Sequence, residues 1–174
     1  MDKELAVQSL TDTMAKFTAY IGKRLPKDVK SKLIELKTLE TNPLAKSIYD
    51  SMDENQEAAD RLNRPSCQDT GVIQYFVEAG AHFPLLGELQ EILREATEEA
   101  TRTGPLRHNA VETFDEKNTG TNTGTQIPWL DWRIVPEQDT CTIDVYMAGG
   151  GCTLPGAAKV LMPGQGYEGV AEFV

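Results

Sequence analysis

Residues 141–147 read CTIDVYM, and apolar and polar side chains alternate along them without a break. A period of two places the apolar side chains on one face of a β-strand and the polar side chains on the other. The preceding residues 127–135 are rich in tryptophan and β-branched side chains, and residues 136–139 (PEQD) have the composition of a turn. We therefore expect residues 127–147 to form an antiparallel hairpin with one buried face.

Upstream of this hairpin, the chain carries one more strand pattern and four helix patterns. Residues 71–77 (GVIQYFV) are a β-rich run. Apolar side chains at three-to-four spacing predict helices over residues 5–22, 26–39, 42–62 and 84–103. Asn42 followed by Pro43 is a helix start signal, and Gly104 is a stop signal. The sequence thus predicts an α+β fold, with an amino-terminal helical region followed by a small mixed or antiparallel sheet.

The length and the end of the chain suggest one domain with contacts beyond itself. A chain of 174 residues suits a single domain, mainly helical over residues 1–103 and rich in strands and glycine loops over residues 104–174. Residues 170–174 (VAEFV) read as the start of an apolar helix or strand. We expect either that the sequence is part of a longer chain or that this last element docks on a partner.

The charge and the cysteines exclude several functional classes. With 27 acidic and 17 basic side chains the formal net charge is −10, which argues against binding nucleic acid or an acidic membrane. No apolar run approaches the length of a membrane span, and the first residues lack an export signal. The three cysteines are an odd number at spacings that do not fit a zinc site. We expect a cytoplasmic protein with free thiols.

Three polar or glycine-rich segments are candidates for chemistry. Residues 64–71 (RPSCQDTG) precede a strand, residues 104–112 (GPLRHNAVE) follow a helix, and residues 118–124 (NTGTNTG) and 148–156 (AGGGCTLPG) form glycine loops. Arginine can grip a carboxylate with two hydrogen bonds, and successive glycine amides can turn toward an anion. The residues alone equally allow a polar turn, a solvated loop cation and flexible connections.

In combination and in this order, RPSCQDTG, NTGTNT (118–123) and AGGG (148–151) resemble the amino-terminal part of the iron–sulfur hydro-lyase family of class I fumarases and L(+)-tartrate dehydratases. Residues 106–112, 146–156 and 159–163 resemble the α subunit of the tartrate branch, whereas fumarases usually carry a serine in place of Cys152. The resemblance implies dehydration of (R,R)-tartrate to oxaloacetate. The alternatives are fumarate hydration, as in a class I fumarase, and a cluster-free chain that acts as an assembly or binding module.

The resemblance also implies a cofactor, a site and a partner. A [4Fe–4S] cluster would be held by three cysteines, of which Cys67 matches the first, while the other two lie beyond Val174 in the family. Cys141 and Cys152 are expected to serve packing. The residues implied to line the pocket for a small dicarboxylate substrate are Gln68, Asp69, Arg107 and Gly150, with Asp69 as the catalytic group on the reacting hydroxyl. A β subunit in a heterotetramer would complete the enzyme, so this chain alone is expected to be inactive.

Overall fold

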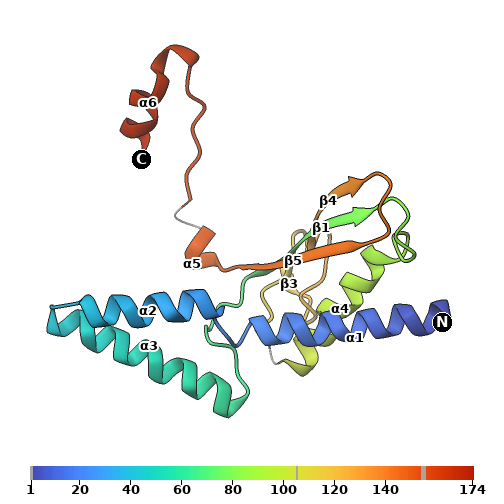
Figure 1. Cartoon of the computed structure of the whole chain (residues 1–174), viewed down its shortest axis with the longest axis horizontal. Helices are drawn as coiled ribbons and strands as arrows, with labels where there is room; N and C mark the ends of the chain where they lie inside the picture. Colours follow the sequence, from blue (N-terminus) through green and yellow to red (C-terminus); the bar gives the residue numbers. More distant parts are fainter. Residues whose placement is uncertain (1, 105, 154–155) are drawn as a thin grey trace.

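The computed structural model describes residues 2–104, 106–153 and 156–174 (Figure 1). The helices come first and a small mixed sheet follows, so the predicted α+β class is confirmed. The elements are α1 (Lys3–Ile21), α2 (Lys27–Leu39), α3 (Pro43–Leu62), β1 (Val72–Gly80), α4 (Leu89–Thr103), β2 (Val111–Glu112), β3 (Lys117–Asn118), β4 (Trp129–Val135), β5 (Cys141–Ala148), α5 (Gly150–Thr153), the 3-10 turn η1 (Pro163–Gln165) and α6 (Gly166–Phe173). None of the described helices is long and apolar enough to cross a membrane.

The three-stranded sheet has the order β4-β1-β5, and this corrects the predicted hairpin. β4 and β5 are not neighbours, because β1 lies between them, parallel to β4 and antiparallel to β5. β1 takes the centre because alternate side chains along it, from Ile73 to Ala79, are almost fully buried. The connection from β4 to β5 crosses the end of β1, where the Gly80 and His82 amides donate to Thr140 O and Gln138 O. The alternation in β5 was read correctly; its pairing partner was not.

Helices α1 and α4 lie side by side against one face of the sheet (Figure 1). Small side chains on both helices, among them Ala15, Ala19, Ala96 and Ala100, are buried in the core that they share with β1. The Tyr75 hydroxyl lies 3.1 Å from Thr18 Oγ1 of α1 and 3.0 Å from Thr97 Oγ1 of α4. Burial raises the pKa of the Tyr75 phenol. One buried hydroxyl therefore links the sheet to both helices.

α4 ends where the sequence predicts but begins five residues later. Residues 84–88 form turns, in which the Leu86 and Glu88 amides donate to Phe83 O and Leu85 O. Each of these bonds spans three residues, and the α-helical pattern of four starts only with Ile92. At the other end a Cβ on Gly104 would lie 2.4 Å from Ala19 Cβ, so the stop glycine also lets α1 approach.

We call α1, α4 and the three-stranded sheet the body of the molecule. Helices α2 and α3 form a hairpin that projects from this body (Figure 1). Their bounds match the predicted ones closely, and Asn42 caps α3 by accepting from the Leu44 amide at 2.9 Å. α2 buries no residue and α3 buries Ala59 alone. Lys37 of α2 reaches two carboxylates of α3, Asp50 at 2.7 Å and Asp53 at 2.8 Å, which raise the pKa of Lys37.

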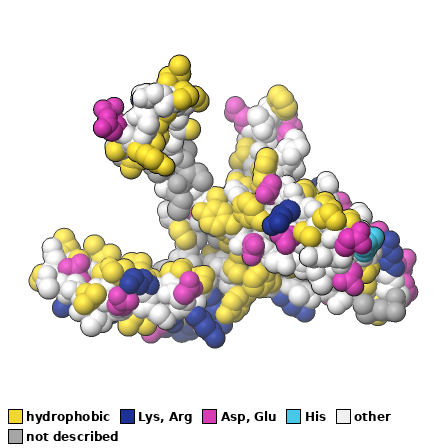
Figure 2. Space-filling view, turned by 45° about the horizontal axis from the view of Figure 1, so that its top comes forward, with side chains coloured by type: hydrophobic (Ala, Val, Ile, Leu, Met, Phe, Trp, Pro, Cys, Tyr) yellow, Lys and Arg dark blue, Asp and Glu magenta, His cyan; other side chains and the backbone are white. Residues whose placement is uncertain are grey.

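The end of the chain forms a helix, α6, one of the two forms expected for it. An extended segment carries η1 and α6 away from the sheet (Figure 1). Tyr167 of α6 is exposed, and Figure 2 shows hydrophobic side chains on this terminal part.

Candidate functional site

The sheet register brings two of the three candidate segments together. β1 runs antiparallel to β5, so Val72 at the start of β1 pairs with Ala148 at the end of β5. Residues 64–71 lead into the first position and the glycines 149–151 leave the second. Sequence positions about 80 residues apart thus meet at one edge of the fold.

The Asp69 carboxylate ties these segments to a third one. Asp69 Oδ1 accepts from the Gly71 amide at 2.9 Å and from Asn109 Nδ2 at 3.0 Å, and Asp69 Oδ2 accepts from the Gly150 amide. Asp69 is partly buried, and with Asn109 and Gly150 it lines a cavity of about 330 Å³. We call this arrangement of Asp69, Gly71, Asn109 and Gly150 the carboxylate clasp.

Two glycines make the clasp sterically possible. Gly71 has φ +75°, and a Cβ there would lie 2.2 Å from the Ala148 carbonyl carbon. A Cβ on Gly149 would approach Asp69 Oδ2 to 3.2 Å. The left-handed backbone at Gly71 and the close contact both favour glycine over any larger residue.

Asn122 holds the segment that carries Arg107 and Asn109. Its side chain is buried, and its Oδ1 accepts from the Asn109 amide at 2.8 Å. Its Nδ2 donates to Arg107 O at 2.8 Å and to Thr101 Oγ1 of α4 at 3.1 Å. Thr70 Oγ1, beside Asp69, accepts from the Arg107 amide at 3.1 Å. The NTGTNT motif therefore anchors the Arg107 backbone from one side and the RPSCQDTG motif from the other.

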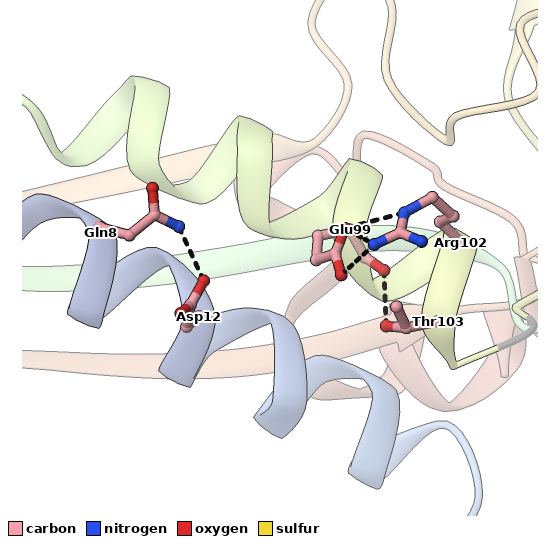
Figure 3. A network of polar contacts seen from close by, with 5 residues as sticks. All are labelled: Gln8, Asp12, Glu99, Arg102 and Thr103. Atoms are coloured by element: carbon pink, nitrogen blue, oxygen red, sulfur yellow. Dashed lines mark hydrogen bonds and ion pairs between the residues drawn. The ribbon is translucent and has the colours of Figure 1, made fainter.

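A larger hollow of about 1270 Å³ opens beside the clasp. One wall is polar surface of α1 and α4, where Gln8 donates to Asp12 at 2.8 Å and Arg102 pairs with Glu99 at 2.6 Å (Figure 3). Candidate residues and their neighbours also line the hollow, namely Arg64, Gln68, Arg107, His108 and Asn109.

Two of the three arginines that line this hollow, Arg102 and Arg107, differ in their pairing. Arg102 donates to the Glu99 carboxylate from Nε and from Nη2. The Arg107 guanidinium is exposed and makes no hydrogen bond or ion pair with any residue in the described ranges. Its charge is therefore available to an anion from solution, whereas the charge of Arg102 is already matched.

The structure groups the predicted site residues as two sets joined by one residue. Asp69 and Gly150 line the smaller cavity, Gln68 and Arg107 line the hollow, and Asn109 lines both. The Gly150 amide donates its hydrogen bond to Asp69 Oδ2, so it points toward this carboxylate.

Cys67 lies before the start of β1, whereas Cys141 pairs with Ala79 near the other end of that strand. Cys67 is exposed, while Cys141 is partly buried against the core and burial raises the pKa of its thiol. A raised pKa disfavours the thiolate that metals bind, which supports the predicted packing role of Cys141. The side chain of Cys152 lies outside the described residues. Among those that are described, no group of three or more His, Cys, Asp or Glu could hold a metal ion.

Sequence reasoning missed Asn109 and Asn122, although both lie in the motifs it singled out. Their partners come from other segments: Asn109 bonds Asp69, 40 residues away, and Asn122 bonds Thr101, 21 residues away. A positive φ of 58° at Asn122 is typical of asparagine among non-glycine residues. The available signal was the repeated Asn-Thr pattern.

Comparison with known proteins gives a family and named relatives. The family described as fumarate hydratase (Fumerase) matches residues 11–174. Proteins named L(+)-tartrate dehydratase subunit alpha are 59% identical in Escherichia coli strain K12 and 60% identical in Escherichia coli O157:H7, over 99% of this chain and 57% of each relative. A putative L(+)-tartrate dehydratase subunit alpha of Methanocaldococcus jannaschii is 32% identical over 86% of this chain and 54% of the relative. The chain thus spans little more than half the length of these relatives.

Proposed function

The chain belongs to the fumarate hydratase (Fumerase) family, and on that premise we propose that it forms part of a hydro-lyase that dehydrates (R,R)-tartrate to oxaloacetate. The family resemblance inferred from the motifs is confirmed. The names of the relatives support tartrate as the substrate. The observation that carries the proposal is the free Arg107 guanidinium beside the carboxylate clasp.

Arg107 and Gln68 suit the binding of a dicarboxylate. A guanidinium can donate two parallel hydrogen bonds to one carboxylate, and an amide side chain adds a neutral donor. Both side chains are exposed to the same hollow. Arg107 is held by backbone contacts to Thr70 and Asn122, so its position is fixed without using its charge.

Asp69 is placed to accept one further hydrogen bond. An ionised carboxylate has about four acceptor positions. Three are taken by the Gly71 amide, Asn109 Nδ2 and the Gly150 amide. We assign the fourth to the reacting hydroxyl of the substrate, with Gly150 lining the pocket and orienting the carboxylate.

Arg107 and Gln68 are placed to stabilise the negative charge that develops on the substrate during dehydration. Removing a proton from the carbon next to a carboxylate spreads negative charge onto that carboxylate. Arg107 and Gln68 would stabilise this charge as it forms, while Asp69 holds the hydroxyl that departs. We assign the base for the C–H proton, and the acid that assists the departing hydroxyl, to other parts of the complete enzyme.

The residues described here do not by themselves fit the [4Fe–4S] cluster that the resemblance implies. They supply one exposed thiol, Cys67, and Cys141 is packed against the core. Cys67 is proposed as one ligand in the complete enzyme, with the remaining thiolates from outside this chain segment. The relatives' name, subunit alpha, supports a second subunit, and a heterotetramer with a β subunit is proposed.

Two tests separate the proposal from its alternatives. The complete enzyme, assembled anaerobically with its second subunit, should turn over (R,R)-tartrate with a kcat/KM well above that for fumarate; the reverse order would favour the fumarase alternative named by the family. An assembly that binds no cluster and shows neither activity would favour the cluster-free binding module.

The second test addresses Arg107 directly. Arg107→Ala should lower kcat/KM by roughly a hundredfold or more, because a charged donor to the substrate carboxylate is lost. Arg102→Ala is the matched control, since Arg102 lines the same hollow but is paired with Glu99. Equal effects of the two substitutions would contradict the assignment.

A further inference from the structure

The Asn109 side chain connects the two sets of residues in the candidate site. Asn109 Nδ2 donates to Asp69 Oδ1 at 3.0 Å and to Gly71 O at 3.4 Å, so both of its N–H groups have a partner. Asn109 also lies two residues after Arg107 and lines both the smaller cavity and the hollow. One amide therefore ties the segment that carries the free guanidinium to the Asp69 carboxylate.

The backbone of Asn109 is held independently of this side chain. Its amide donates to Asn122 Oδ1 at 2.8 Å, and Asn122 Nδ2 donates in turn to Arg107 O and to Thr101 of α4. Because these bonds do not involve the Asn109 side chain, a substitution at residue 109 can remove the bond to Asp69 and leave the Arg107 segment in place.

The two oxygens of Asp69 differ in how far their acceptor positions are filled. Each oxygen of an ionised carboxylate offers about two such positions. Oδ1 accepts from the Gly71 amide and from Asn109 Nδ2, so both of its positions are taken. Within the described ranges Oδ2 accepts from the Gly150 amide alone, which leaves one position open. Without Asn109, each oxygen would have one open position.

We propose that Asn109 is a positioning residue that fills Oδ1 of Asp69, so that the reacting hydroxyl binds only at Oδ2. This inference rests on the proposed function, in which Asp69 holds that hydroxyl. Oδ2 is the oxygen on the side of the glycine turn that follows β5. A hydroxyl bound at Oδ1 instead would be displaced from its reacting geometry, and a displacement of about 1 Å can lower a rate roughly 100-fold. Asn109 thus acts through Asp69 rather than on the substrate.

The test compares Asn109→Leu with Asn109→Gln in the complete enzyme, assembled anaerobically with its second subunit. Leucine has the branched shape of asparagine without its donor, whereas glutamine keeps the amide on a longer side chain. With whichever of tartrate and fumarate the wild type turns over faster, Asn109→Leu should lower kcat about tenfold or more without raising KM, because unproductive binding at Oδ1 becomes possible. Asn109→Gln should recover part of the lost kcat.

Asn118→Leu is the matched control, because Asn118 Nδ2 donates to His108 O of the same segment and makes no bond to Asp69. It should keep kcat within about threefold of wild type. An equal fall in kcat in Asn109→Leu and Asn118→Leu would overturn the proposal and assign both asparagines to holding the segment. An Asn109→Leu enzyme as active as wild type, or one in which KM rises at unchanged kcat, would also overturn it.

Hydrogen exchange in the same assembly gives a readout that does not depend on turnover. In Asn109→Leu the Gly71 and Gly150 amides should stay protected, because each keeps its own bond to Asp69. Free exchange of both amides would show that the carboxylate clasp is lost, which would overturn positioning as the cause of a lower kcat. A wild-type assembly inactive on both substrates would instead refute the proposed function, and this inference with it.

Discussion

Helices α3 and α4 have comparable sequence patterns and different surroundings. Both carry apolar side chains at three-to-four spacing and many acidic residues on the remaining surface. α4 buries seven of its 15 residues against β1 and α1, whereas α3 buries one of 20. The difference teaches that periodicity identifies an apolar face but not what covers it. In α4 the apolar face is covered by α1 and the sheet, whereas no described residue buries the apolar row of α3.

The largest expected effect on stability is at Gly71, where the carboxylate clasp joins the start of β1. Gly71→Ala forces a Cβ to within 2.2 Å of backbone at Ala148 and strains φ +75°. It should lower the free energy of unfolding by more than about 3 kcal/mol, measured by urea denaturation. Gly87→Ala is the control, because a Cβ there meets nothing within 4 Å. A Gly71→Ala protein as stable as the control would contradict this description of the β1 start.

The next prediction compares the cost of removing a leucine side chain from α4 with the cost of removing one from α3. Leu93→Ala in α4 removes a fully buried side chain and should cost about 2 to 5 kcal/mol. Leu44→Ala in α3, where the side chain is 70% exposed, should change the free energy of unfolding by less than about 0.5 kcal/mol. Both are measured by urea denaturation. Similar costs at the two positions would remove the contrast between body and hairpin.

A smaller effect is expected at Asn122, whose buried side chain bonds Thr101 of α4. Asn122→Ala removes the acceptor for the Asn109 amide and the donor to Arg107 O, and should cost about 1 to 3 kcal/mol. Asn122→Gly keeps access to φ 58° but lacks the same hydrogen bonds. If thermal unfolding shows the glycine variant to be as stable as wild type, backbone conformation rather than hydrogen bonding explains this position.

The smallest effect concerns Tyr75 and its pH dependence. Tyr75→Phe removes a hydroxyl shared by Thr18 and Thr97 and should cost about 1 kcal/mol near neutral pH. Burial raises the pKa of Tyr75 above its ordinary value of 10.0, so the folded state favours the protonated phenol. That contribution is present below pH 10 and is lost as pH rises through the folded pKa.

The pH part is checked by urea denaturation at pH 9 and pH 11. Wild type should lose more stability between the two values than Tyr75→Phe does. Tyr146→Phe, which alters an exposed tyrosine, should behave like wild type. A loss in Tyr75→Phe as large as that of wild type would assign the alkaline instability to other groups.

Local signals in the sequence predicted the helices well and the strand pairing less well. The Asn42-Pro43 start of α3 and the Gly104 end of α4 depend on neighbouring residues, so they could be read from the sequence. The turn at residues 136–139 was also read correctly, but a turn does not reveal that a third strand lies between the two it joins. That choice depends on β1 as the most buried strand, which is a property of the whole sheet.

In the candidate site, too, local motifs could be predicted from the sequence, whereas the contacts between distant segments could not. The motifs with Asp69, Arg107 and Gly150 were recognised as segments, and their roles stay proposals. The clasp itself needed the fold, because the Gly150 amide is 81 residues from the Asp69 carboxylate that accepts its hydrogen bond. Asn109 and Asn122 escaped notice for this reason, since an asparagine in a loop has no predictable partner until distant segments are placed.

Hydrogen–deuterium exchange of the dilute chain tests the contrast between body and hairpin most directly, and it examines the clasp in the same experiment. The amides of β1 and α4, and those of Gly71 and Gly150 that donate to Asp69, should exchange much more slowly than the amides of α2 and α3. Equal protection of the hairpin and the body at low concentration, or free exchange at Gly71 and Gly150, would contradict the account.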